Sequence, residues 1–295
     1  MVAIIINECL KVTVKSSGAE LISIKNTFTN KEYLWQGDPE FWGRRAPILF
    51  PIVGKVNANK YKIDGETYNL PQHGFARDMH FERIDQQDNT LTYLLKSTED
   101  TLKVYPFKFE LTVTYKLEKN KVIVSYEVKN TDDKNIWFSL GAHPAFNCPL
   151  EANEQFSDYY LEFEKSENDS SCVLENGLIT EKKIPVLNNT KVLPLSTELF
   201  DSDAVIFKDI RSSVVKLKSQ KSGHQVALDF TGFPYLAFWS KKGGAPFVCI
   251  EPWYGIADKV DYSGDFKEKD GIKSLAKGKI FKSEYSIEIT TPKNK

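Results

Sequence analysis

The sequence lacks the features typical of membrane-spanning and nucleic-acid-binding proteins. No apolar run approaches the roughly 18 residues that a membrane-spanning helix requires. The 39 basic and 40 acidic residues are evenly spread and leave a net charge of −1, so no basic stripe is available for phosphate backbones or lipid headgroups. We therefore expect no nucleic-acid or membrane partner, and a small neutral or weakly charged ligand fits the charge balance better.

The N-terminus lacks the features of a secretion signal. Its short apolar run has no basic segment before it and no small-residue cleavage site after it, so Ile4, Ile5 and Ile6 are predicted to form the first strand. In a chain of 295 residues without such a signal, we expect free thiols and a cytoplasmic location. The four cysteines are scattered and show no CxxC spacing: Cys9, Cys148, Cys172 and Cys249.

Motifs for metals and cofactors are also missing. The histidines lack the HExxH or HxH spacing of metal ligands, and no carboxylate cluster stands beside them in the sequence. No G-x-G-x-x-G or Walker loop occurs, and no G-x-S-x-G elbow of serine hydrolases. We therefore expect a protein that works with neither a metal nor a cofactor.

What the sequence does contain is alternation with a period of two residues. In residues 107–117 the apolar side chains fall on one face and Lys, Glu and Thr on the other, and residues 122–128 repeat the scheme after an EKNK turn. This pattern predicts a long antiparallel hairpin with one wet face. Asp64-Gly65 is a strong signal for a second hairpin. Further strands are expected in five runs: 81–97, 213–230, 235–240, 247–253 and 284–290.

Helical patterns are scarce. Residues 196–200 and 270–276 could each supply a turn or two, and there is no fixed-period repeat, βαβ alternation or flexible linker. The chain is 41% hydrophobic and 13% aromatic, which suffices for one large core. We predict a single all-β domain over residues 1–295, with many antiparallel strands in two large packed sheets.

Two histidines stand in constrained positions. His73 lies between Pro71-Gln72 and Gly74, and His143 follows an apolar run and directly precedes Pro144, which biases it toward an extended backbone. A core histidine bonded to a backbone carbonyl is the alternative at either position. Their shared setting, a strand end flanked by Gly and Pro, favours a directed pair at a site. His80 and His224 lie beside charged residues and are predicted to be surface groups.

Glu251 ends the apolar strand 248–250 and is followed by Pro252. A carboxylate at such a place is costly to desolvate, so it should find a partner or have its pKa raised, as a general base does. A buried glutamate that caps a neighbouring loop is the alternative. Trp253 could be a core aromatic or could cover the apolar face of a sugar ring. A glycosidase would need two credible acids, and only Glu251 stands out.

Adjacent arginines precede the apolar run 46–53. Arg44 and Arg45 cannot both point inward, because strand side chains alternate between the two faces. One of them could reach a site in the sheet while the other meets solvent, and a solvated charge pair is the alternative. The candidate site residues that remain are therefore two histidines and one glutamate in constrained backbone positions, and one arginine.

Four segments carry a resemblance to a known family. "APILFPIVGKV", "LPQHGFARD", "GAHPAF" and "FVCIEPWYGIAD" together resemble the aldose 1-epimerase (galactose mutarotase-like) family, and within it the LacX-like branch. The chain also shares HGFAR and the EP step with hexose-6-phosphate epimerases. The segments are ordered as in that family between residues 44 and 258. The resemblance implies a β-supersandwich with an open sugar site, and interconversion of α and β anomers of a sugar without a metal or cofactor.

The resemblance also implies roles for particular residues. Glu251 would be the general base that takes the proton of the C1 hydroxyl, His143 the general acid that protonates the ring oxygen, and His73 a donor that supports them. Arg44 matches the family's substrate-binding arginine, and Asp203 in "LFDSDAVIF" is the candidate for its binding aspartate. A Glu/His pair suits proton transfer near neutral pH.

Departures from the galactose branch concern the substrate. Phe75 follows the first HG where that branch has a glycine, and its HPYFN-like element is HPAFN here. Arg77 is either a structural ion-pair partner or a residue that faces a sugar phosphate. The sequence leaves open a hexose or a hexose 6-phosphate as substrate, and whether the chain forms a homodimer. The alternative functions are a non-catalytic sugar-binding or sugar-sensing protein and, less favoured, a glycosidase or lyase.

Overall fold

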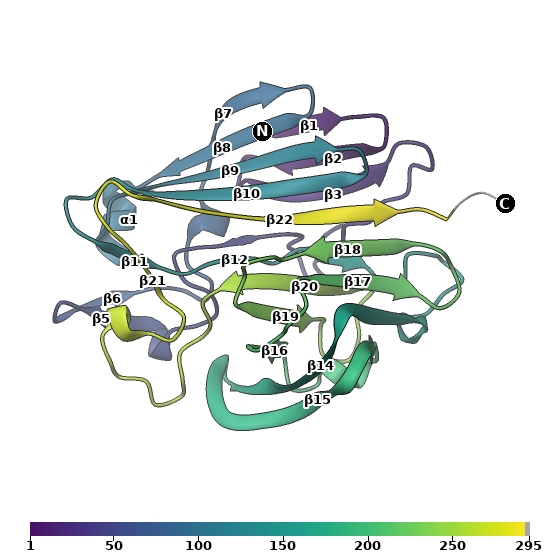
Figure 1. The fold of residues 1–295 in the computed structure, drawn as a ribbon. Helices are drawn as coiled ribbons and strands as arrows, with labels where there is room; N and C mark the ends of the chain where they lie inside the picture. The colour runs from purple at the N-terminus through teal and green to yellow at the C-terminus, as the bar shows by residue number, and fades with distance from the viewer. Residues whose placement is uncertain (293–295) are drawn as a thin grey trace.

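A computed structural model describes residues 1–292 of the chain, and antiparallel strand pairs dominate it (Figure 1). The largest sheet has 15 strands. In chain order these strands are β4 (Ile48–Leu49), β7 (Glu82–Gln87), β8 (Thr90–Lys96), β9 (Phe109–Glu118), β10 (Lys121–Asn130), β12 (Leu140–Ala142), β13 (Ala145–Asn147), β14 (Tyr159–Glu175), β15 (Leu178–Pro194), β16 (Val205–Phe207), β17 (Val214–Ser219), β18 (Gln225–Asp229), β19 (Tyr235–Trp239), β20 (Phe247–Tyr254) and β22 (Ile280–Thr290).

Three smaller sheets complete the β structure. They are a three-stranded sheet of β1 (Val2–Ile6), β2 (Leu10–Lys15) and β3 (Glu20–Asn26), the pair β5 (Lys60–Ile63) and β6 (Glu66–Asn69), and the pair β11 (Ile136–Phe138) and β21 (Lys273–Leu275). The helices are short: α1 (Glu99–Val104) and the 3₁₀ turns η1 (Asn57–Asn59), η2 (Ala76–Asp78), η3 (Phe156–Asp158), η4 (Thr197–Phe200) and η5 (Phe266–Glu268). None of the helices in residues 1–292 is long and apolar enough to cross a membrane.

The all-β prediction is confirmed. Hydrogen bonds link the main strands into one continuous ladder, in the order β4-β12-β20-β19-β16-β14-β17-β18-β22-β10-β9-β8-β7. Figure 1 shows β7 to β10 and β22 side by side, and β18, which pairs with β22, continues the same sheet below them in this view. One main core cluster includes residues from Ala3 to Ile289.

Most of the expected strands are present. The predicted hairpin is β9–β10, and its buried residues alternate with partly exposed ones along both strands. Asp64 and Gly65 both have positive φ and join β5 to β6, as a tight hairpin turn requires. The helical turn predicted for 270–276 is wrong, because Lys273–Leu275 pairs with Ile136–Phe138 as β21. Long-range pairing overrides a weak local preference there.

The short helix α1 was not predicted. Its start carries a capping box in which the Thr98 side chain accepts a hydrogen bond from the backbone N–H of Thr101, and the Thr101 side chain accepts one from the backbone N–H of Thr98. The sequence signal was the pair of threonines around Glu99-Asp100, two acids that suit the first turn of a helix. Residues 197–200, by contrast, form the expected turn, η4.

Strand β20 is buried on both faces, and this places the site. Val248 and Ile250 belong to the main core, while Cys249 and Trp253 belong to two smaller apolar clusters on the opposite face. Because side chains alternate along a strand, Glu251 lies on that second face, between the two smaller clusters. A polar group thus sits in an apolar wall, away from the main core.

Candidate active site

A cavity of about 330 Å³ lies over the second face of β20. Its volume falls in the range of small-molecule sites. Six of the seven expected site residues line it: His73, Arg77, His143, Asp203, Glu251 and Trp253. Arg44, the seventh, is not among the lining residues, and its guanidinium pairs with Asp78 at 2.9 Å.

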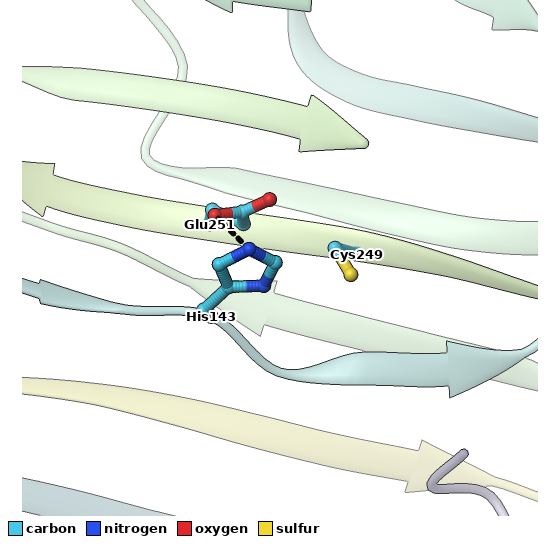
Figure 2. Close-up of side chains that lie close together, drawn as sticks. All are labelled: His143, Cys249 and Glu251. Carbon is cyan, nitrogen blue, oxygen red and sulfur yellow. Dashed lines mark ion pairs between the residues drawn. The ribbon is translucent and has the colours of Figure 1, made fainter. Parts of the chain in front are cut away.

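The register of three strands brings His143 opposite Glu251. Gly141 of β12 pairs with Trp253 of β20, and Ala145 of β13 pairs with Cys249 of β20. The same antiparallel register therefore continues through the break between β12 and β13. The Ile250 N–H donates to the Pro144 carbonyl at 3.1 Å within that break. Directly opposed residues share a face, which is why the imidazole points at the carboxylate (Figure 2). His143 Nε2 lies 3.2 Å from Glu251 Oε2.

Both members of this pair are withdrawn from water. Glu251 is 1% exposed and His143 is 8% exposed. Burial lowers the pKa of His143 to about 3, and the Arg77 and Arg44 charges act in the same direction. Burial, and secondly the negative charge of Asp203, raises the pKa of Glu251 well above its ordinary value. These directions favour a neutral imidazole beside a carboxyl group that keeps its proton.

His73 is held in a demanding backbone conformation. Its φ is +65°, a region that few residues other than glycine adopt. Its N–H donates to the Gly54 carbonyl at 2.7 Å, and the Gly54 N–H donates back to His73 Nδ1 at 3.1 Å. Burial lowers the pKa of His73 well below its ordinary value, so the ring is neutral. Since Nδ1 accepts, Nε2 carries the hydrogen, and the side-chain amide of Gln72 lies 3.3 Å from it at the cavity wall.

Gly54 cannot be replaced by a larger residue without displacing a neighbour. Its φ is +70°, and an added Cβ would lie 2.6 Å from the Ala257 side chain. Gly54 and Ala257 both line the cavity, and the Asp258 N–H donates to the Lys55 carbonyl at 2.8 Å beside them. The loop after β4 and the loop after β20 are thereby packed against each other beneath His73.

Two tryptophans complete the wall, and sequence analysis missed both. Trp42 stacks on the His143 ring with centroids 4.8 Å apart and an interplanar angle of 27°, and Trp239 meets the same ring edge-on at 5.9 Å. The sequence predicts a strand over residues 235–240, which includes Trp239, but it indicates no site role for Trp239 or Trp42. The period-two pattern places Trp239 on the same face of its strand as Ala237, but the pairing of Ala237 with Glu251 is visible only in the structure.

Arg77 reaches the cavity from η2. Its Nη2 donates to the Gln72 carbonyl at 2.6 Å, while its Nε is buried and has no hydrogen-bond partner within residues 1–292. Asp78 is 3.8 Å from that Nε, beyond hydrogen-bond distance, and its side chain is 57% exposed. Burial and the charge of Arg44 lower the pKa of Arg77 to about 10, and this guanidinium remains charged at neutral pH. Arg44 and Arg77 therefore share the single, solvent-exposed carboxylate of Asp78 as their ion-pair partner.

Asp203 reaches the cavity mouth from the loop after η4. Its φ is +78°, and its Oδ1 accepts a hydrogen bond from the Ala204 N–H at 2.8 Å. The residue is exposed, so its carboxylate can meet a ligand at the rim. The strained backbone of a residue other than glycine indicates that its position is held by the surrounding structure.

The remaining histidines lie away from the cavity. His80 is exposed, as predicted. The surface prediction for His224 is wrong: it is 7% exposed, and its Nδ1 lies 2.8 Å from the Tyr33 hydroxyl and its Nε2 2.7 Å from Glu151. Burial follows from this pairing, because Tyr33 and Glu151 satisfy both ring nitrogens. The four cysteines are free thiols, as expected.

Comparisons with known proteins give a consistent result. The family model described as aldose 1-epimerase matches residues 1–269. The chain is 36% identical to "Protein LacX, chromosomal" of Lactococcus lactis subsp. lactis over 96% of the chain and 97% of that protein. A solved galactose mutarotase related enzyme from Lactobacillus acidophilus has a TM-score of 0.94 at 36% identity, covering 100% of the chain and 99% of its own. A galactose mutarotase-like protein from Lactobacillus casei has a TM-score of 0.91 at 36% identity, covering 98% and 100%.

Proposed function

The chain belongs to the aldose 1-epimerase family, and from this premise we propose that it interconverts the α and β anomers of a hexose or hexose phosphate. One observation carries the proposal: a buried histidine and a buried glutamate, 3.2 Å apart, share the wall of a cavity that accepts a small molecule. Anomer exchange needs one proton removed from the C1 hydroxyl and one delivered to the ring oxygen. These two oxygens are attached to the same carbon, so two adjacent protein groups can serve them.

In the proposed reaction Glu251 takes the proton of the C1 hydroxyl and His143 protonates the ring oxygen. The bond between C1 and the ring oxygen then breaks and leaves an open-chain aldehyde. Rotation about the C1–C2 bond presents the other face of the carbonyl, and ring closure returns both protons to their donors. The pair carries one proton in total, and its transfer from Glu251 to His143 across the 3.2 Å contact prepares base and acid together.

Other residues of the cavity are proposed to position the sugar. The Nε2–H of His73 donates to a sugar oxygen near His143, since the two imidazole centroids are 5.8 Å apart. Trp239 and Trp253 offer apolar faces, which suit the C–H surface of a pyranose. Asp203 accepts a hydrogen bond from a sugar hydroxyl at the cavity mouth.

The pair of arginines supports a phosphorylated sugar as the preferred substrate. Arg77 lines the cavity with a buried Nε that lacks a partner in residues 1–292, and the charge of Arg44 reaches His73, His143 and Arg77. A phosphate group accepts bidentate hydrogen bonds from a guanidinium. A structural ion pair between Arg77 and Asp78 is a weaker explanation at 3.8 Å. Arg44 does not line the cavity. We therefore propose that it attracts the phosphate group by its positive charge rather than by direct contact.

We also propose that residues 1–295 work as one domain in the cytoplasm. The main core cluster joins residues from Ala3 to Ile289. The free thiols of the four cysteines fit a reducing compartment.

A substrate panel tests the function. Freshly dissolved α-glucose, α-galactose and their 6-phosphates are followed by polarimetry, and magnetisation transfer between anomers is followed by NMR. The proposal expects acceleration that is proportional to protein concentration, with the 6-phosphates favoured. Sugar binding without any acceleration would instead identify a non-catalytic sugar-binding protein, and release of reducing ends from oligosaccharides would identify a glycosidase.

A further inference from the structure

Cys249 completes a set of metal-ligand types beside the proposed catalytic pair. One ligand atom from each of His143, Cys249 and Glu251 lies within 4.8 Å of the other two, and all three residues are buried. Cys249 and Glu251 are two apart on β20 and share a face, and His143 approaches them from the neighbouring strand (Figure 2). We propose that these three side chains form a binding site for a thiophilic divalent cation such as Zn²⁺, and that the bound cation excludes the sugar.

The donor set selects the kind of metal. Imidazole nitrogen, thiolate sulfur and carboxylate oxygen together suit Zn²⁺ or Co²⁺, whereas Mg²⁺ and Ca²⁺ prefer oxygen donors alone. Metal–ligand bonds of about 2.0–2.3 Å in a tetrahedron place the ligand atoms roughly 3.3–3.8 Å apart. The present separations, at most 4.8 Å, need only side-chain adjustments to reach this range. Three protein ligands leave a fourth position for a water molecule.

The environment of the trio supports a ligand between its members. Oε2 of Glu251 is buried and makes no hydrogen bond among the described residues, although His143 Nε2 is 3.2 Å away. A buried carboxylate oxygen without a hydrogen-bond donor can accept a ligand. Cys249 is fully buried and lies across from Ala145 and Trp239 on the two neighbouring strands.

Charge balance explains why the thiol is needed. Arg77 and Arg44 place positive charge near the site and oppose a free cation. A divalent cation bound by a thiolate, a carboxylate and a neutral imidazole forms a complex with no net charge, which a buried site tolerates. Binding releases the thiol proton and any proton on the carboxyl group to solvent. Loss of the thiolate would leave a net positive charge beside two arginines.

Cobalt spectroscopy tests the site without requiring any enzymatic turnover. The protein is stripped with a chelator, freed of it, and titrated with Co²⁺ while the thiolate-to-cobalt charge-transfer absorption is recorded. The wild type and the matched control Cys172→Ser, which removes another buried free thiol, should give a saturable band at one Co²⁺ per chain. Cys249→Ser should lose the band and bind Co²⁺ at least about tenfold more weakly. A band that survives in Cys249→Ser overturns the proposal.

Inhibition gives the second measurement and rests on the proposed function. Zn²⁺ should inhibit anomer exchange competitively with the sugar, while Mg²⁺ at the same concentration should have no effect. Inhibition is normalised to the metal-free rate of each variant, and equal Zn²⁺ sensitivity in Cys249→Ser and wild type would contradict the assignment. Should Cys249→Ser not fold, His143→Gln must show the same loss of Co²⁺ affinity. If the protein gives the cobalt band but does not accelerate anomer exchange, the metal-site proposal stands and only the proposed epimerase activity is refuted.

Discussion

His143 lies directly opposite Glu251 across neighbouring strands, and their side chains meet at 3.2 Å between Nε2 and Oε2. The flanking register fixes this geometry, because Gly141 pairs with Trp253 and Ala145 with Cys249 on either side. Backbone hydrogen bonds of a buried sheet thus set the distance between two reactive groups. Groups held in this way need little rearrangement to act together.

Replacement of the carboxylate should abolish most of the catalysis while preserving the fold. Glu251→Gln keeps the shape and removes the proton acceptor, so the rate of anomer exchange should fall by about 10²–10⁴-fold. Sugar binding, measured by calorimetry, and the circular dichroism spectrum should remain close to those of the wild type. Glu99→Gln, on the exposed surface of α1, is the matched control and should keep full activity. Wild-type rates in Glu251→Gln would remove this residue from the mechanism.

The two members of the pair should behave as one unit. His143→Gln alone is expected to lower the rate of anomer exchange about as much as Glu251→Gln, because each proton transfer requires the other. The rate of the double variant should therefore lie within a few-fold of the rate of the slower single variant. Rate losses that multiply in the double variant would show that the two groups act independently.

The proposed catalytic residues could be predicted from the sequence, but most of the side chains that pack around them could not. His73, His143 and Glu251 each directly precede Gly or Pro, a local feature that can be read without knowing the fold. The prediction that Glu251 ends its strand is wrong, because β20 continues through Pro252 to Tyr254. Trp42 could not be predicted, because its contact with His143 joins two segments that are far apart in the sequence. His224 shows the same limit, since its burial depends on Tyr33, 191 residues away.

Fold class followed from the alternating pattern, but sheet order did not. Hairpins such as β9–β10 are local and could be predicted from their turns. The pairing of β11 with β21 joins residues more than 100 positions apart, and no local pattern in 273–275 indicates it. The trio of His143, Cys249 and Glu251 was hidden for a related reason, because its spacing in space comes from strand register rather than from a sequence motif.

Arg77 should distinguish phosphorylated from free sugars. Arg77→Ala removes a guanidinium from the cavity wall, so KM for hexose 6-phosphates should rise by about 10–100-fold, the loss of a charge-assisted hydrogen bond worth roughly 1.5–3 kcal/mol. The kcat for free hexoses should change little. Arg83→Ala on the exposed strand β7 is the control for the loss of one positive charge. An equal rise of KM for free and phosphorylated sugars would indicate a structural role for Arg77.

Gly54 should be essential for the position of His73. Gly54→Ala combines a positive φ with a Cβ placed 2.6 Å from the Ala257 side chain. Gly65 in the β5–β6 turn also has a positive φ, but an added Cβ would meet nothing within 4 Å. The conformational penalty alone is about 1–2 kcal/mol, so Gly65→Ala should lower the free energy of unfolding by about that amount, and Gly54→Ala by more.

Urea denaturation measures both variants, and the rate of anomer exchange separates them further. Gly54 bonds His73 through its N–H and its carbonyl, so any backbone shift at position 54 moves the imidazole. Gly54→Ala should therefore lose activity even where it is fully folded, whereas Gly65→Ala should retain it. If both substitutions cost the same stability and leave the rate unchanged, the close approach of Gly54 to Ala257 does not hold His73 in place.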